Sequence, residues 1–183
     1  NQSIYLEHFQ LRQDPFRQEP DPENFFSKAG RGDMLQRLQG DIESGKPLIK
    51  LTGSNGVGKT LLYLMLAQKL PSETFDLVCP DHPVGSFEDL LRIICHALRR
   101  NPGSETVSPQ SYLPEFKEHL RQRGENQRKV ILIIDEAEKL FLATLERLVR
   151  LICDTDEGNV LHILLIGRPE LEKNIDQLVI YCS

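Results

Sequence analysis

The chain has 183 residues, 39% of them hydrophobic, so its length predicts one domain with a well-buried core. The 22 Lys and Arg against 27 Asp and Glu give a formal net charge of −5, which disfavours nucleic acid or an acidic membrane as the partner. No apolar run approaches the ~18 residues of a transmembrane helix, and we see no secretory signal. We expect the four dispersed cysteines (Cys79, Cys95, Cys153 and Cys182) to be buried free thiols in a reducing compartment. These features predict a soluble, cytoplasmic domain.

The first 27 residues predict an irregular arm. Pro15, Pro20 and Pro22 interrupt any helix, and four phenylalanines supply apolar anchors that a solvated tail would not need. We therefore expect residues 1–27 to pack on the remaining domain, residues 28–183.

The rest of the chain alternates helices and strands. In chain order the predicted elements are a helix over 33–43, a strand over 48–51, a helix over 61–70, a strand over 74–78, helices over 86–100 and 113–123, a strand over 130–134, a helix over 141–153, a strand over 160–166 and a helical turn from 169. The strand over 130–134 is apolar at every position, as in a parallel strand buried on both faces. This alternation predicts a three-layer α/β fold with a parallel sheet and a site at the carboxyl ends of its strands.

A glycine-rich loop of sequence GSNGVGKT follows the first predicted strand. Its spacing, G-x-x-x-x-G-K-T, is that of a P-loop, in which glycines allow positive φ and let backbone N–H groups approach phosphate oxygens. Lys59 would reach the β- and γ-phosphates of ATP, the Thr60 hydroxyl would ligate Mg²⁺, and the following helix would direct the positive end of its dipole at the phosphates. The predicted nucleotide-binding residues are Gly53, Ser54, Asn55, Gly56, Val57, Gly58, Lys59, Thr60 and Leu61.

Two carboxylates, Asp135 and Glu136, follow the most apolar strand. We expect Asp135 to hold Mg²⁺ together with Thr60, and Glu136 to orient and deprotonate a water molecule, which favours hydrolysis over transfer to a small substrate. Arg168 follows the last strand, where a polar side chain can contact the γ-phosphate, although a solvated charge or an ion pair suits this position equally. The candidate catalytic residues are thus Lys59, Glu136 and Arg168.

With these motifs in place, the chain resembles AAA+ ATPases of the group that includes general secretion pathway protein A and the MSHA pilus biogenesis ATPases. The matching stretches are YLEHF at 5–9, PF at 15–16, PDP at 20–22, FF at 25–26, IESG at 42–45, the P-loop, IDEA at 134–137 and LIGRPEL at 165–171. The resemblance implies an AAA+ core that binds ATP or ADP with Mg²⁺ in the cytoplasm. The full-length protein would self-associate, work with an envelope secretion or pilus assembly protein and in many cases be anchored in the inner membrane.

Two departures from this group bear on activity. The group usually has Gln where Arg168 stands, and the chain stops at Ser183, before the helical lid and second sensor arginine that the resemblance implies. We therefore expect slow hydrolysis by this stretch alone. Two other functions stay open: a DNA-linked ATPase of the transposition type, which the acidic balance disfavours, and a nucleotide-gated adaptor with little turnover.

Overall fold

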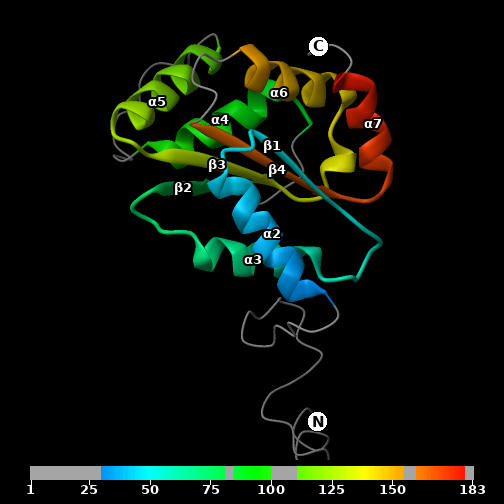
Figure 1. The fold of residues 1–183 in the computed structure, drawn as a ribbon. Helices are drawn as coiled ribbons and strands as arrows, with labels where there is room; N and C mark the ends of the chain where they lie inside the picture. Colours follow the sequence, from blue (N-terminus) through cyan, green and yellow to red (C-terminus); the bar gives the residue numbers. More distant parts are fainter. Residues whose placement is uncertain (1–29, 81–84, 100–110, 155–159, 180–183) are drawn as a thin grey trace, which may run out of the picture.

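The computed structural model describes residues 30–80, 85–99, 111–154 and 160–179, which form one parallel sheet between two layers of helices (Figure 1). The strands are β1 (Leu48–Thr52), β2 (Phe75–Val78), β3 (Lys129–Ile134) and β4 (Leu161–Gly167). The helices are α2 (Arg31–Glu43), α3 (Lys59–Lys69), α4 (Phe87–Leu98), α5 (Leu113–Glu125), α6 (Leu142–Asp154) and α7 (Glu170–Val179), with a 3₁₀ turn, η2 (Ala137–Lys139), after β3. The predicted α/β class with a parallel sheet is confirmed.

The strands run in the order β1-β4-β3-β2, and every pair is parallel. Strand β4 therefore lies between the strand that precedes the P-loop and the strand that ends at Asp135. Its register pairs Thr52 of β1 with Gly167, and Ile134 of β3 with Leu165. Because parallel strands end at the same edge of a sheet, this order gathers the P-loop, the acidic pair and Arg168 at one edge.

Alternate residues of the central strands enter two separate cores. Val130, Leu132 and Ile134 of β3 pack in the core under α4, α5, α6 and α7, whereas Ile131 and Ile133 pack in the core under α2 and α3. Figure 1 shows these helices covering opposite faces of the sheet. Burial on both faces explains why β3 is apolar throughout.

The ends of most expected elements lie within two residues of the observed ones, and two elements also differ in kind or surroundings. The helix predicted over 141–153 begins at Leu142 and is preceded by η2, and the helical turn predicted from 169 is the ten-residue helix α7. The arm predicted over 1–27 lies outside the described residues. No helix among the described ranges has the length and apolar character needed to cross a membrane.

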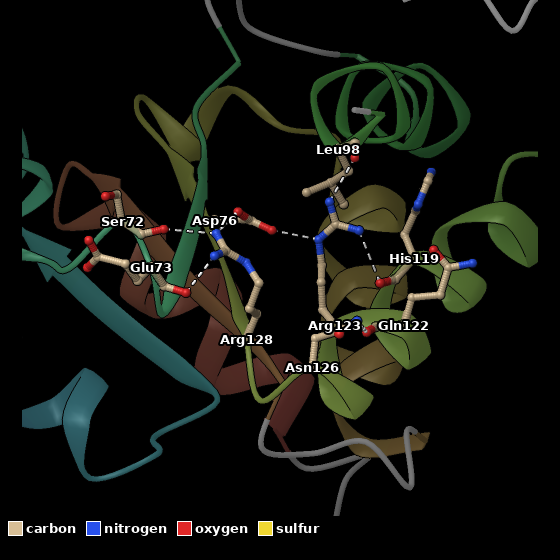
Figure 2. Close-up of polar contacts among 9 residues, drawn as sticks. All are labelled: Ser72, Glu73, Asp76, Leu98, His119, Gln122, Arg123, Asn126 and Arg128. Atoms are coloured by element: carbon tan, nitrogen blue, oxygen red, sulfur yellow. Dashed lines mark hydrogen bonds and ion pairs between the residues drawn. The ribbon is translucent and has the colours of Figure 1, made fainter. Parts of the chain in front are cut away.

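A polar cluster joins the layers at the amino ends of β2 and β3, opposite the P-loop edge. Figure 2 shows Asp76 of β2 between Arg123 and Arg128: the carboxylate accepts a hydrogen bond from Nε of Arg123 at 2.8 Å and another from Arg128. Arg123 also donates to the carbonyl oxygens of Leu98 and His119, at 2.7 and 3.3 Å. Burial alone would raise the pKa of Asp76, but the hydrogen bonds from Arg128 and Arg123 lower it overall.

The expectation of four buried free thiols is wrong for two cysteines. Cys95 is buried and free, but Cys79, directly after β2, is exposed. Cys153, exposed on α6, is disulfide-bonded. The cysteines therefore do not support the inference of a reducing compartment.

Candidate functional site

The P-loop connects β1 to α3 in a conformation that needs glycine. Gly56 and Gly58 adopt φ angles of 77° and 90°, which side chains with a Cβ rarely adopt. The N–H of Gly53 donates to the carbonyl of Gly167 at 3.1 Å, which ties the start of the loop to the end of β4. Gly58 caps α3 and, being a glycine, supplies no side-chain acceptor for the N–H groups at this helix end. These groups, with the helix dipole, suit an anion.

Lys59 and Thr60 occupy the first turn of α3. Nζ of Lys59 donates to the carbonyl oxygens of Gly53 and Ser54, at 2.7 and 3.0 Å, so the ammonium group lies over the loop. Thr60 Oγ1 donates to Asp135 Oδ2 at 2.9 Å. This bond links the P-loop helix to the acidic end of β3, as the predicted magnesium site requires.

Glu136 adopts a left-handed conformation, with φ of 53°. Its N–H donates to Asp135 Oδ1 at 2.8 Å, and its Oε2 lies 2.6 Å from Nζ of Lys139. A non-glycine residue in this region is uncommon and is found at sites where the chain changes direction for a functional reason. Here the left-handed turn ends β3 and starts η2.

Arg168 lies at the same edge, at the end of β4. Its Nε donates to Oδ1 of Asn55 in the P-loop at 3.2 Å. Oε2 of Glu138 accepts a hydrogen bond from the Arg168 N–H at 3.2 Å, and Oε1 of Glu138 lies 3.4 Å from Nε of the same arginine. A Cβ at position 167 would lie 2.6 Å from Oε2 of Glu138, so the close approach of Glu138 needs the glycine.

A cavity of about 460 Å³ opens between these groups. Its lining includes most of the residues that the sequence predicted, namely Asn55, Gly56, Gly58, Lys59, Thr60, Leu61, Asp135, Glu136 and Arg168. Three predicted residues are not in the lining: Gly53 pairs with β4, Ser54 contributes its carbonyl to Lys59, and Val57 is exposed. The donors and acceptors present match a nucleoside triphosphate with Mg²⁺: backbone N–H groups, an ammonium, a hydroxyl and a carboxylate.

Two residues near the cavity were not predicted from the sequence. Glu138 lines the cavity, and its side chain is only 14% exposed. The guanidinium of Arg31 lies near Gly58, since its Cζ would be 3.9 Å from a Cβ placed there. The signal for Glu138 was a third carboxylate three residues after Asp135, whereas Arg31 stands far from any motif in sequence.

Comparison with known proteins identifies the family. The AAA domain family matches residues 42–175, which is most of the chain. The chain belongs to the AAA domain family. It is also 30% identical, over 176 residues, to general secretion pathway protein A of Aeromonas hydrophila. That match covers 95% of this chain but only 32% of the relative, so the chain spans about a third of that protein's length.

Two solved structures share the fold at low sequence identity. The Cdc6p protein of Pyrobaculum aerophilum superposes with a TM-score of 0.63 at 19% identity, covering 92% of this chain and 45% of that chain. The ORC2 protein of Aeropyrum pernix, in its ADPNP–ADP complexes, also has a TM-score of 0.63, at 15% identity, covering 87% of this chain and 47% of that one. At these identities the likeness establishes the α/β P-loop fold.

Proposed function

We propose that this AAA domain binds Mg-ATP in the cavity at the carboxyl edge of the sheet and hydrolyses it to ADP and phosphate. The observation that carries the proposal is the 2.9 Å hydrogen bond from Thr60 Oγ1 to Asp135 Oδ2. This bond links the P-loop helix to the acidic end of β3. The phosphate-binding residues and the carboxylate proposed to hold Mg²⁺ therefore line one cavity.

Binding would use the backbone of residues 55–60 and the ammonium of Lys59. The cap residue Gly58 offers no side-chain acceptor to the N–H groups at the start of α3, so phosphate oxygens would satisfy them. Lys59 would exchange its bonds to the Gly53 and Ser54 carbonyls for phosphate oxygens, because hydrogen bonds between ionised partners are stronger than those to neutral carbonyls. Thr60 and Asp135 would hold Mg²⁺, whose charge neutralises phosphate oxygens during hydrolysis.

Glu136 would act as the base. Its carboxylate would accept a proton from water as the water oxygen bonds to the γ-phosphorus and the bond from that phosphorus to the β,γ-bridging oxygen breaks. Arg168, already beside Asn55 of the loop, would donate to the γ-phosphate. Nζ of Lys139 lies 2.6 Å from Oε2 of Glu136, so this ion pair competes with a water molecule for that oxygen.

Calorimetry and a phosphate-release assay test this proposal. Lys59→Ala should abolish Mg-ATP binding, while Glu136→Gln should keep binding and remove turnover. Lys69→Ala, an exposed lysine at the far end of the same helix, is the matched control and should behave as the wild type. Equal ATP affinity in wild type and Lys59→Ala would reject the site.

For the cellular role, we propose that the domain powers or switches assembly of a secretion or pilus machine in the bacterial envelope, working in the cytoplasm, where ATP is made. The 30% identity to general secretion pathway protein A along 95% of the chain supports this role. In a strain lacking the gene, the full-length wild type should restore protein secretion or surface pili, and Lys59→Ala should not. Restoration by Lys59→Ala would show that the cellular role does not require nucleotide binding at this site.

The ion pair between Glu136 and Lys139 favours one alternative, a nucleotide-gated adaptor that binds ATP but scarcely hydrolyses it. The same complementation distinguishes the two. An adaptor would tolerate Glu136→Gln and fail with Lys59→Ala, whereas an ATP-driven machine would fail with both.

A further inference from the structure

Three side chains with the chemistry of metal ligands meet between α4 and α5. Cys95 lies on α4, and Glu115 and His119 lie one turn apart on α5. One ligand atom from each, the Cys95 sulfur, a Glu115 carboxylate oxygen and a His119 ring nitrogen, lies within 4.8 Å of the other two. These residues are separate from the cavity that the P-loop lines.

His119 supplies a second observation. Its Nε2 is buried and has no hydrogen-bond partner among the described residues. The ring's nearest polar neighbour is a carboxylate oxygen, Oε1 of Glu115, which lies 3.4 Å away at the long end of hydrogen-bonding distance. Figure 2 shows that Arg123 binds the backbone carbonyl of His119 and not its ring. A buried ring nitrogen without a well-formed hydrogen bond is uncommon, and a bound ion is one of its ordinary explanations.

We propose that Cys95, Glu115 and His119 form a binding site for Zn²⁺ or a chemically similar divalent cation. Thiolate, imidazole and carboxylate are the ligands that zinc uses in proteins, at about 2.0–2.3 Å. Tetrahedral geometry at those lengths places ligand atoms roughly 3.3–3.8 Å apart, so side-chain shifts of about 1 Å suffice. Water completes the fourth position.

The charges around the site agree with this assignment. Burial, with the Glu115 carboxylate adding to it, raises the pKa of the Cys95 thiol to about 12, so without a cation the thiol stays protonated. A coordinating cation displaces that proton. Arg99 donates to both Glu115 oxygens, at 2.8 and 3.0 Å, which orients the carboxylate and leaves a lone pair on each oxygen. The positive charge of Arg99 opposes the cation, so affinity should be moderate.

A cation at this position would fix α4 to α5 across the 99–112 connection. Both helices cover the same face of the sheet (Figure 1), and α4 and α5 are joined there by the Arg99–Glu115 ion pair. The site is thus a structural clamp. Its occupancy should change stability and leave the nucleotide chemistry in place.

The test is a titration of tag-free protein with ZnCl₂ and, separately, CoCl₂. Excess Mg²⁺ keeps the nucleotide site from competing, and oxygen-free buffer without added thiol keeps the Cys153 disulfide closed. One equivalent should bind, cobalt should give a thiolate-to-metal charge-transfer band, and zinc at a hundredfold excess over its Kd should raise the melting temperature by about 5–10 °C.

Variants assign the ligands. Cys95→Ser and His119→Gln should each weaken zinc binding at least tenfold, and Cys95→Ser should remove the cobalt band. Circular dichroism would establish that both fold. Cys79→Ser, which changes an exposed cysteine outside the site, and His96→Gln, which changes an exposed histidine of α4, should bind as the wild type does. Absence of the band in the wild type, or equal zinc affinity in His119→Gln and wild type, would overturn the proposal.

Discussion

Glu138 holds Arg168 at two points. Its Oε2 accepts a hydrogen bond from the main-chain N–H at 3.2 Å, and its Oε1 lies 3.4 Å from the guanidinium Nε. The Glu138 side chain is 14% exposed, whereas that of Arg168 is 49% exposed, so the carboxylate is the fixed partner and the arginine the adjustable one. Glu138 is therefore a positioning residue for the group that we propose contacts the γ-phosphate.

Replacing Glu138 should lower turnover more than ATP binding. Glu138→Ala frees Arg168, and we expect kcat to fall about tenfold with little change in KM, because the arginine is less well placed when charge develops on the phosphate. Glu138→Gln keeps an acceptor for the N–H and should retain most of kcat. Glu170→Ala, an exposed neighbour on α7, is the control in the same steady-state assay. An equal loss in both alanine variants would point to a general effect of charge.

Lys139→Met should raise turnover. The change releases the Glu136 carboxylate from an ion pair whose two side chains are about half exposed. Exposed pairs contribute about 0.2–1 kcal/mol, so the gain in kcat should not exceed about fivefold. Lys69→Met serves as control. A lower rate constant for Lys139→Met in single-turnover assays would show that the lysine assists the reaction.

Arg123→Met should destabilise the fold without touching the nucleotide site. The Arg123 side chain is 9% exposed, and its guanidinium donates to Asp76 and to two backbone carbonyls, so its loss leaves these acceptors unpaired. We expect the free energy of unfolding, measured with urea, to fall by about 2–4 kcal/mol. Arg121→Met removes an exposed arginine of the same helix and should cost less than about 1 kcal/mol. Similar losses in the two variants would contradict a special role for the cluster around Asp76.

His162 should make stability depend on pH. Its ring is fully buried on β4, and Nδ1 lies 2.8 Å from the carbonyl of Lys46, so the proton of the neutral ring lies on Nδ1. Burial lowers the pKa of His162 below the usual 6.5, against a smaller opposite effect of the Lys46 hydrogen bond. Below pH 6.5 the unfolded chain binds a proton that the folded chain does not, so the free energy of unfolding should fall as the pH falls toward the folded pKa.

The comparison of urea unfolding at pH 7.5 and 5.5 measures this dependence. His162→Gln, which can still donate to Lys46, should lose up to about 1.4 kcal/mol less than the wild type over the whole of this interval. Exposed His96→Gln should retain the wild-type slope. Burial also lowers the pKa of His119, so part of the dependence should remain in His162→Gln. If the pH dependence of the unfolding free energy is the same in His162→Gln and the wild type, His162 binds its proton in the folded chain as it does in the unfolded chain.

The P-loop edge of the sheet could be predicted from the sequence because its signals are local. Glycine spacing fixed the loop, and five consecutive apolar residues before Asp135 marked a strand buried on both faces. Parallel strands then required Asp135 and Thr60 to meet. Glu138 could not be found in this way, since the left-handed turn at Glu136 and the 3₁₀ turn after it interrupt the helical periodicity on which the prediction relied.

Local sequence signals did not predict which cysteines are exposed or which one is disulfide-bonded. Cys79 follows a strand whose residues are in part buried, and Cys153 ends an amphipathic helix, so apolar neighbours suggested burial in both cases. Whether a residue at the end of a strand or helix faces the core depends on the backbone direction at that end, which the apolar pattern does not define. The meeting of Cys95 with Glu115 and His119 likewise depends on how α4 packs on α5, which sequence spacing does not encode.

The pairing of β1 with β4 sets an order for folding during synthesis. Leu48 lies beside Ile163, and the N–H of Gly53 donates to the carbonyl of Gly167. Among the described strands, β1 pairs with β4 alone, so this neighbour is missing until more than a hundred further residues have been made. Contacts so distant in sequence form slowly, because the loop must close before any contact is gained. An emerging chain would thus carry its phosphate loop, complete in sequence, long before the loop is held in shape. The ability to bind nucleotide should appear abruptly, once β4 has left the ribosome.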